Sequence, residues 1–163
     1  AVNFGKQRGL DLRNHSLDEV SFDEEFFDVI SLFDVLEHLP DPKTITCQAL
    51  KYLKNNGLIF IYVPNWDSAS RILMDKEAHF IWPTHHLNYY TPKTISEFLI
   101  NLDLKVEYIA TEGLDMVDYI WNQREQKNND PTGITDIANK LQFFINAGGY
   151  GKNLRVIARK NGA

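Results

Sequence analysis

The chain alternates between apolar runs and mixed segments, and the alternation is clearest between residues 27 and 63. Residues Phe27–Phe33 are short, apolar and rich in β-branched and aromatic side chains, which predicts a buried strand. Asp41 then suits a helix N-cap, and Pro42 follows at the first helical position, where its missing N–H costs nothing. The predicted helix has one apolar face, formed by Ile45, Ala49, Leu50 and Leu53.

A glycine is expected to end this helix, and a second strand follows directly. Lys51 and Lys54 suit the last turn of the helix, and Gly57 is expected to supply a left-handed stop. Leu58–Val63 is almost unbroken in apolar residues, which predicts a strand covered on both faces, as in a parallel sheet. Strand, helix and strand together predict a right-handed βαβ unit.

Further apolar patterns predict the remaining elements. A helix is expected over Ser68–Met74, and another begins at Pro92 with Thr91 as its N-cap. Leu104–Tyr108 alternates between apolar and polar residues, as a strand with one wet face does. The other predicted elements are two helical segments and a last strand: Leu114–Gln126, Ile134–Ile145 and Leu154–Ala158.

An ordered series of motifs carries a family resemblance. Between residues 27 and 65 the chain reads FDVI, DVLEHL, DP, LKNNG and VPN, in that order. At these spacings the series resembles the second half of class I S-adenosylmethionine-dependent methyltransferases that act on sugars and other small molecules. The likeness is strongest over Gly9–Asn65 and weaker over His85–Thr111. It implies an α/β fold, the Rossmann-like three-layer sandwich with a mostly parallel sheet and an antiparallel last strand, and S-adenosylmethionine as cofactor.

Proteins of this kind open with a strand, a Gly-rich GxGxG loop and a second strand that ends in an acidic residue. Here Gly5 and Gly9 are too far apart for that loop, and the first residue is Ala1. We therefore expect an N-terminally incomplete fold, a single partial domain over residues 1–163 with a helical insertion at about 113–149. The resemblance implies that Ala1–Arg8 is the tail of a helix and that Leu10–Leu12 is a strand.

The same resemblance implies two groups of cofactor contacts. Asn14, Ser16 and Leu17 would lie beside the adenine, although Ser16 with Glu19 also reads as an ordinary capped helix start. Phe33 and Asp34 follow the first central strand, where open α/β sheets bind ligands, and would contact the methionine and sugar portions. Simple core packing is the alternative for Phe33.

Three histidines are candidates for a catalytic base, because an imidazole can accept a proton near neutral pH. They are His38, His85 and His86, and a capping or hydrogen-bonded histidine is the alternative for His38. Aromatic side chains between residues 65 and 90 suit a pocket for a planar or sugar-like acceptor, or else a satellite hydrophobic cluster under a long loop. The candidate acceptor-binding residues are Trp66, Trp82, Tyr89 and Tyr90.

No metal site is predicted. His79, His85 and His86 are the residues that would have to form one, but adjacent histidines in an extended segment point to opposite sides. Cys47 is the only cysteine, so the sequence contains neither a disulfide framework nor a cysteine-based zinc site.

Composition excludes several other classes of function. The 163 residues carry a net charge of −5 with no block of Lys or Arg, which argues against a nucleic-acid partner. No apolar stretch approaches the roughly 20 residues of a membrane span, and a cytoplasmic location is the default expectation. A small-molecule acceptor is the expected partner. A homodimer is a further expectation, because Phe27–Phe33 would have an open apolar edge.

The sequence thus predicts an S-adenosylmethionine-dependent methyltransferase of a small molecule, such as a sugar or metabolite, present here as a fragment that is inactive alone. One alternative is a non-catalytic binding or interaction domain derived from that fold. A dinucleotide-binding enzyme with a similar sheet is the other, and the absence of GxGxxG argues against it.

Overall fold

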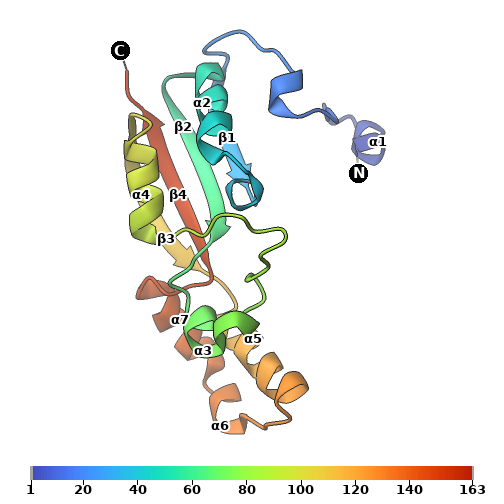
Figure 1. Cartoon of the computed structure of the whole chain (residues 1–163), viewed down its shortest axis with the longest axis vertical. Coiled ribbons are helices and arrows are strands. Elements are labelled where there is room, and N and C mark those ends of the chain that lie inside the picture. The colour runs from blue at the N-terminus through green and yellow to red at the C-terminus, as the bar shows by residue number, and fades with distance from the viewer. Residues whose placement is uncertain (1, 163) are drawn as a thin grey trace.

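A four-stranded mixed sheet forms the body of the protein, and the computed structural model describes it within residues 2–162 (Figure 1). The strands lie in the order β1-β2-β4-β3. β1 and β2 are parallel, whereas β4 runs antiparallel to both of its neighbours. Both the parallel central pair and the antiparallel last strand, inserted between β2 and β3, confirm the predicted fold class. The strands are β1 Phe27–Phe33, β2 Leu53–Pro64, β3 Leu104–Glu112 and β4 Asn153–Lys160.

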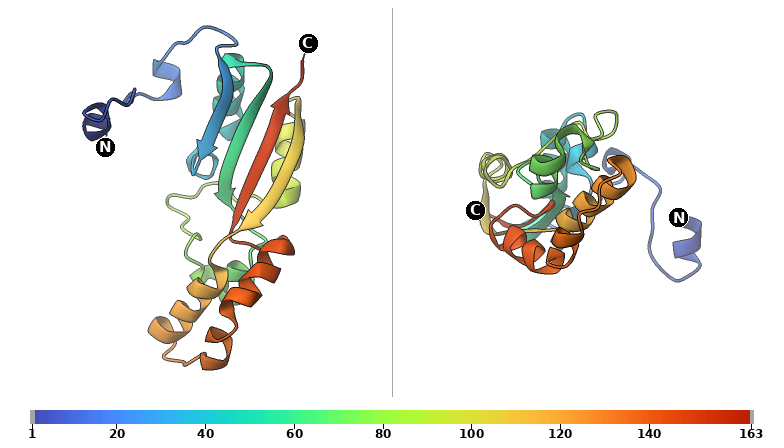
Figure 2. Two further views of the ribbon diagram at one scale, coloured as in Figure 1. Left: turned by 180° about the vertical axis from the view of Figure 1, so that it is seen from behind. Right: turned by 90° about the horizontal axis from the view of Figure 1, so that it is seen from below.

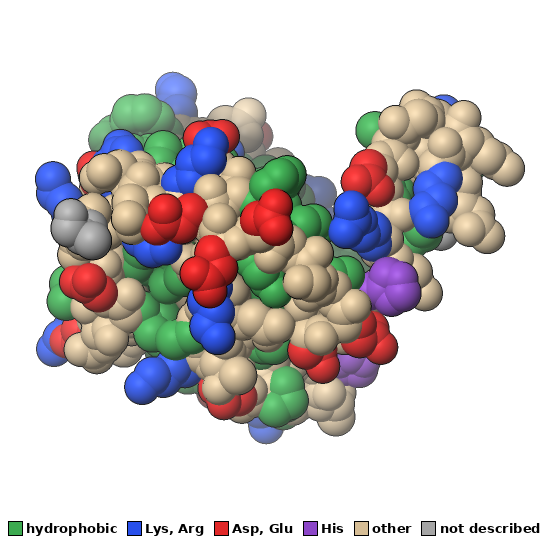
Figure 3. Space-filling model, turned by 90° about the horizontal axis from the view of Figure 1, so that it is seen from above, with side chains coloured by type: hydrophobic (Ala, Val, Ile, Leu, Met, Phe, Trp, Pro, Cys, Tyr) green, Lys and Arg blue, Asp and Glu red, His purple; other side chains and the backbone are tan. Residues whose placement is uncertain are grey.

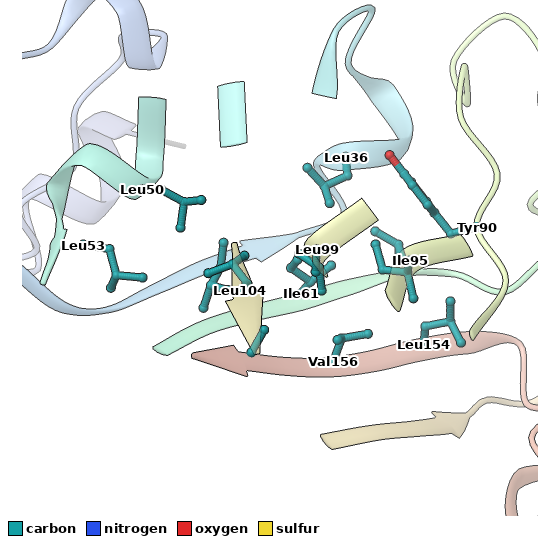
Figure 4. Close-up of a cluster of buried hydrophobic side chains, with 13 residues drawn as sticks. Leu36, Leu50, Leu53, Ile61, Tyr90, Ile95, Leu99, Leu104, Leu154 and Val156 are labelled. Atoms are coloured by element: carbon teal, nitrogen blue, oxygen red, sulfur yellow. The ribbon is translucent and has the colours of Figure 1, made fainter. Parts of the chain in front are cut away.

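Helices α2 (Pro42–Tyr52) and α4 (Pro92–Ile100) lie on one face of the sheet, as the two sides of the molecule in Figures 1 and 2 show. Each begins as the sequence predicts: the Asp41 side chain accepts from the Thr44 N–H, and Thr91 accepts from the Thr94 N–H. The main core lies between these helices and the sheet, and Figure 4 labels these of its side chains: Leu36, Leu50, Leu53, Ile61, Tyr90, Ile95, Leu99, Leu104, Leu154 and Val156.

The opposite face of the sheet has no helix over it among residues 2–162. Along β2, Ile59, Ile61 and Val63 are buried towards the helices, while Phe60 and Tyr62 on the other face are only partly buried. β2 thus has apolar side chains on both faces, as the sequence shows. The prediction that both faces are covered holds for only one of them within residues 2–162.

We call the part of the molecule below the sheet in Figure 1 the helical end. Four helical segments between β3 and β4 belong to it, together with α3 and η3, which follow β2. Gly149 has a φ of +86° and ends the last of these helices, as the sequence predicts. The segments are α3 Ala69–Met74, η3 Asp75–Glu77, α5 Asp115–Trp121, η4 Asn122–Gln126, α6 Thr132–Thr135 and α7 Ala138–Ala147.

Buried polar side chains tie the helical end to the sheet. Asn65, at the end of β2, donates to the carbonyl oxygens of Gly149 (3.2 Å) and Gly151 (2.8 Å). Asp115, which is fully buried, accepts from the Ser70 N–H (3.0 Å), from Gln142 (2.9 Å) and from the Lys152 N–H (2.9 Å). These bonds satisfy backbone groups at the starts of α3 and β4 that would otherwise be buried without partners.

The N-terminal segment extends away from the sheet (Figures 1 and 2). It contains α1 (Val2–Lys6) and a 3₁₀ turn, η1 (Leu17–Glu19). Ser16 and Glu19 form a capping box at the start of η1, as the capped helix start considered for these residues requires. The predicted strand at Leu10–Leu12 is wrong. Its backbone instead closes local turns, since the Leu10 N–H bonds to Gly5 and the Leu12 N–H bonds to Leu10. Groups used in these turns are not available for a strand ladder.

The predicted end of the first helix is also wrong. α2 ends at Tyr52 rather than at Gly57, and Leu53 already pairs with Phe27 of β1. Lys54 lies on the strand and pairs with Asp28 at 2.7 Å instead of occupying a helix turn. Gly57 is required for close approach at this irregular strand start, because a Cβ there would lie 2.7 Å from the Leu53 side chain. The left-handed residue is Asn56, with φ of +62°.

Charge is mixed over the surface that is seen from above in Figure 3, where acidic and basic side chains are interspersed. This face shows no block of one sign, which agrees with the sequence. Within residues 2–162 no helix combines the length and the apolar character that a bilayer crossing requires.

Candidate functional site

The candidate site begins at the C-terminal end of β1. The Asp34 N–H bonds to the Tyr62 carbonyl oxygen of β2 at 3.0 Å, and Asp34 then turns the chain with a φ of +51°. The next turn, η2 (Leu36–His38), buries Leu36 in the main core. Because Leu36 is held there, the neighbouring side chains of η2 are fixed at the end of the sheet, where ligands of such folds bind.

A long segment from the helical end crosses this turn. We call residues 78–90 the aromatic loop. The Glu37 carbonyl oxygen accepts from the N–H groups of Leu87 (2.6 Å) and Asn88 (3.1 Å). The Asn88 side chain donates to the carbonyl oxygens of Leu36 (3.1 Å) and Leu39 (2.7 Å). These four bonds clamp the aromatic loop to η2, so residues far apart in the sequence are held side by side.

The clamp brings together two of the three predicted histidines. The rings of His38 and His86 meet edge to face with their centres 4.8 Å apart. His38 donates from Nδ1 to the His85 carbonyl oxygen at 2.8 Å, and His86 donates from Nδ1 to the Phe80 carbonyl oxygen at 2.7 Å. A carbonyl can only accept, so both Nδ1 atoms carry a proton, and in the neutral form of each ring Nε2 is the bare nitrogen.

His85, the third predicted histidine, contributes its backbone rather than its ring. Its imidazole packs on Trp82 with centres 4.1 Å apart, and its Nδ1 lies 2.8 Å from the Thr84 hydroxyl. The two adjacent histidines therefore point in different directions. The expected extended segment is wrong here, because the N–H groups of His85 and His86 both bond to the Trp82 carbonyl oxygen in a turn.

Glu37 belongs to this site but is not among the candidate site residues that the sequence analysis names. Its side chain is 1% exposed, with Oε1 3.8 Å from Nε2 of His38 and Oε2 without any hydrogen-bond partner in the described structure. Burial raises the pKa of the Glu37 carboxyl above its usual range, although a backbone hydrogen bond and His38 oppose the effect. An acidic residue inside the apolar sequence LEHL was the available signal.

The four predicted acceptor-binding aromatics are distributed between two clusters and the surface. Trp66 and Tyr89 pack with centres 5.0 Å apart against the small cluster of Met74, Ala78 and Phe80. Trp82 is 54% exposed on the aromatic loop. Tyr90 belongs to the main core, where burial raises the pKa of its hydroxyl to about 12. The satellite-cluster alternative thus describes Trp66 and Tyr89 well.

A cavity of about 580 Å³ lies on the uncovered face of the sheet. Phe33 and Asp34 at the end of β1, which the sequence predicts as cofactor contacts, line this cavity together with Tyr62 of β2. Across it, Arg155 of β4 forms an ion pair with Glu112 of β3. Burial raises the pKa of Tyr62, and the Glu112 charge adds to the effect. Sequence reasoning missed Arg155, although the alternation of β4 places it beside Tyr62 on this face.

The other predicted cofactor residues are not brought to this cavity. Ser16 caps η1, and the Leu17 carbonyl oxygen accepts from Gln48 on α2 at 3.1 Å. Asn14 lies in the same extended segment, which Figure 2 shows apart from the end of β1. Neither Asn14, Ser16 nor Leu17 lines the cavity beside Phe33 and Asp34.

The chain matches the methyltransferase domain family over residues 5–109. It belongs to this methyltransferase family. S-adenosylmethionine, the cofactor that the sequence predicts, is the methyl donor of such proteins.

Curated relatives agree with this assignment. A ubiquinone biosynthesis O-methyltransferase of Pasteurella multocida is 44% identical over 119 residues, which cover 55% of this chain and 49% of the relative. One from Xanthomonas oryzae pv. oryzae is 27% identical over 108 residues, or 62% of this chain and 45% of the relative. The methyltransferase chain thus spans about half the length of these relatives.

Solved structures share the methyltransferase fold at low identity. An S-adenosylmethionine-dependent methyltransferase from Mesorhizobium loti has a TM-score of 0.57 and 15% identity, covering 95% of this chain and 73% of that one. The [4+2]-cyclase SpnF has a TM-score of 0.62 and 14% identity, covering 99% of this chain and 61% of that one. Likeness at this level establishes the fold alone.

Proposed function

We propose that this chain supplies the methionine end of the cofactor site and the acceptor side of a small-molecule O-methyltransferase. The observation that carries the proposal is the pair His38 and His86, joined at the turn that follows Phe33 and Asp34 in the chain, with both Nδ1 atoms bonded to backbone carbonyl oxygens. The names of the curated relatives support transfer to oxygen. The acceptor is then a hydroxyl-bearing small molecule, such as a sugar or another metabolite.

The residues that line the sheet cavity fit the cationic end of S-adenosylmethionine. This cofactor supplies a methyl group on a positively charged sulfur, next to an amino acid with its own ammonium group. Asp34 offers a carboxylate to such charges, and Phe33 and Tyr62 offer aromatic rings, whereas Glu112 is already paired with Arg155. We assign the binding of this end of the cofactor to Phe33, Asp34 and Tyr62.

The histidine pair is suited to take the proton from an acceptor hydroxyl. A neutral imidazole with a bare Nε2 is a competent base near neutral pH. The backbone carbonyl oxygens of His85 and Phe80 fix the tautomers of His38 and His86, and also fix where Nε2 points. His38 is the more accessible of the two, with 42% of its side chain exposed, so we assign the first proton transfer to it.

Trp82 and His85 are proposed to border the acceptor. Their stacked rings stand on the exposed part of the aromatic loop, near the histidine pair in the sequence and joined to it through the His85 carbonyl oxygen. A flat apolar surface at this point suits a planar acceptor or the face of a sugar. Trp66 and Tyr89 would then support the loop from below.

The test uses the natural polypeptide that contains these residues, with labelled S-adenosylmethionine and a panel of phenols and sugars. His38→Ala and His86→Ala should each lower kcat by roughly 10²–10⁴-fold with little change in cofactor affinity. His79→Ala, a histidine outside the pair, is the matched control and should keep its activity. Unchanged kcat in both pair variants would exclude histidine base catalysis.

A non-catalytic binding domain is the second candidate. One observation favours it: the predicted adenine contacts Asn14, Ser16 and Leu17 do not line the cavity beside Phe33 and Asp34. Calorimetry with S-adenosylmethionine tests the expectation that the 163-residue chain alone binds this cofactor weakly or not at all. Micromolar binding to this chain alone would contradict that expectation.

A further inference from the structure

The start of β2 contains a short segment that lies outside the sheet ladder. β1 pairs with Leu53 and next with Leu58, and the pairing of β4 with β2 also begins at Leu58. The residues between these two, Lys54–Gly57, form an irregular turn in which Asn56 has a φ of +62°. Asn56 is exposed, so this turn presents to solvent an asparagine that is followed directly by a glycine.

An asparagine that precedes a glycine is especially prone to lose its side-chain amide, for a steric reason. The backbone nitrogen of the next residue can attack the side-chain carbon Cγ, and a glycine has no Cβ to hinder the approach. Asparagine is accordingly one of the thermolabile residues. The chain has two such pairs, Asn56-Gly57 and Asn161-Gly162. The sequence does not distinguish them, whereas their surroundings in the structure do.

A neighbouring guanidinium activates the peptide between Asn56 and Gly57. Arg159 on β4 donates from Nη1 to the Asn56 carbonyl oxygen at 2.7 Å. This oxygen is conjugated with the Gly57 nitrogen, so a positive charge bonded to it stabilises that nitrogen after the loss of its proton, which is the attacking form. Glu107 holds the guanidinium in place by accepting from Nε at 2.7 Å and from Nη2 at 2.9 Å.

The side-chain amides of the two asparagines are held differently. Within residues 2–162 the only hydrogen bond with a side chain that Asn56 makes uses its backbone carbonyl oxygen. Its amide lies beside Gly162, where an added Cβ would be 3.2 Å from Nδ2. Asn161, in contrast, donates from its side-chain amide to Oδ1 of Asp103 at 2.8 Å. That bond must break before the Asn161 side chain can react, whereas the Asn56 side chain has no such restraint.

We propose that Asn56 and Gly57 form a self-modification site, at which the Asn56 amide is converted to a carboxylate with water as the only co-reactant. The Gly57 nitrogen loses its proton and bonds to Cγ of Asn56. The bond between Cγ and the side-chain nitrogen breaks, and this nitrogen takes up a proton and leaves as ammonia. Water then adds to either carbonyl of the cyclic imide, which opens to aspartate or isoaspartate without any oxidation or reduction.

Both products change the end of the sheet that lies opposite the candidate site. Aspartate places a new carboxylate near Arg159, where it competes with Glu107 for the guanidinium. Isoaspartate lengthens the main chain by one carbon atom just before β2 joins the ladder at Leu58. Phe33 and Asp34 lie at the other end of β1, so the proposal does not depend on the proposed methyl transfer.

The test follows the unaltered natural polypeptide during incubation in mildly alkaline buffer. Mass spectrometry of its peptides measures the loss of each side-chain amide, and electron-transfer fragmentation separates isoaspartate from aspartate. We expect Asn56 to be converted several-fold faster than Asn161, although a glycine follows both. Asn128 is the matched control, because it is exposed with a φ of +51° but precedes Asn129, and it should keep its amide. An intact Asn56, or equal rates at Asn56 and Asn161, would overturn the proposal.

Two variants test the part that Arg159 plays. Arg159→Gln removes the positive charge from the Asn56 carbonyl oxygen and should slow the conversion several-fold. Glu107→Gln leaves the guanidinium in the chain, so it is the matched control and should not slow the conversion. A rate in Arg159→Gln that equals or exceeds the rate in the unaltered protein would overturn the assignment to Arg159. The comparison of Asn56 with Asn161 needs no variant and so does not depend on how the variants fold.

Discussion

The sheet and the helical end are stabilised in different ways. Side chains such as Ile61, Ile95 and Leu154 are fully or almost fully buried between the sheet and its two helices. The helical end has a much smaller apolar cluster and leaves Phe143 and Phe144 more than 60% exposed. Its position depends on buried hydrogen bonds from Asn65 and Asp115. Packing of buried apolar side chains therefore stabilises the sheet, whereas hydrogen bonds to buried polar side chains hold the helical end in place.

The histidine site lies where these two parts meet. η2 belongs to the sheet through Leu36, while the aromatic loop begins inside the small cluster of the helical end, to which Ala78 and Phe80 belong. One half of the site is therefore anchored rigidly, and the other half depends on the clamp around Asn88. The comparison predicts that mutations on the two sides will affect stability and the site in different proportions.

The largest effect is expected from a cavity in the sheet. Ile61→Ala should lower the free energy of unfolding by about 2–5 kcal/mol, because a buried side chain is removed from a packed core. The matched control is Phe143→Ala in the helical end, where the ring is 68% exposed and little should change. Denaturant unfolding measures both. Equal losses would contradict the contrast between the two parts.

A buried polar partner should matter most in the helical end. Asp115→Ala leaves the N–H groups of Ser70 and Lys152 without their acceptor, at a cost of roughly 1–3 kcal/mol. Hydrogen exchange should show faster opening of α3 and of the start of β4, with the centre of the sheet unaffected. Asp136→Ala, an exposed acidic residue in the same part, is the control. If α3 and the start of β4 exchange as slowly in the Asp115→Ala variant as in the unaltered protein, Asp115 does not hold the helical end in place.

Asn88→Ala should separate the two halves of the site. The carbonyl oxygens of Leu36 and Leu39 lose a donor, at about 1 kcal/mol for each bond. We expect faster hydrogen exchange in the aromatic loop, with η2 still in place. Asn139→Ala, exposed on α7, should leave this exchange rate unchanged. An unchanged exchange rate in the loop would show that the backbone bonds of Glu37 suffice.

The smallest expected effect is a pH response confined to the helical end. A hydrogen bond from Lys127, with a second from Asn122, holds the pKa of Glu77 below its usual value of 4.5. A depressed carboxyl pKa contributes stability above the unfolded value, and that contribution is lost as the pH falls through the folded pKa. Fluorescence of Trp121, which lies beside these residues, should report the loosening below pH 4.5. Glu77→Gln should remove the acid response; its persistence would assign the response elsewhere.

Local patterns predicted most of the sheet because each strand and cap carries its own signal. The apolar run Phe27–Phe33 and the pairs Asp41–Pro42 and Thr91–Pro92 appear where expected. The junction at Leu53 could not be found in this way, since the helical period continues through a residue that the sheet requires as a strand partner of Phe27. Pairing between distant residues decided that boundary.

The site was predicted in parts for the same reason. Position after a strand indicated Phe33, Asp34 and His38, and these lie at the end of β1. The distinction between His85 and His86 depends on the Glu37 carbonyl oxygen, which fixes the loop from a distant turn. Tyr90 looked like part of a pocket but is 7% exposed within the core. Composition alone does not separate these two environments.

The central claim is that the end of β1 and the aromatic loop face the reacting end of the cofactor. A crystal structure of the natural polypeptide with S-adenosylhomocysteine tests it most directly. The account predicts the cofactor sulfur beside Phe33 and Asp34, turned towards His38 and His86. A sulfur bound elsewhere, with Phe33 and Asp34 outside the cofactor site, would contradict it.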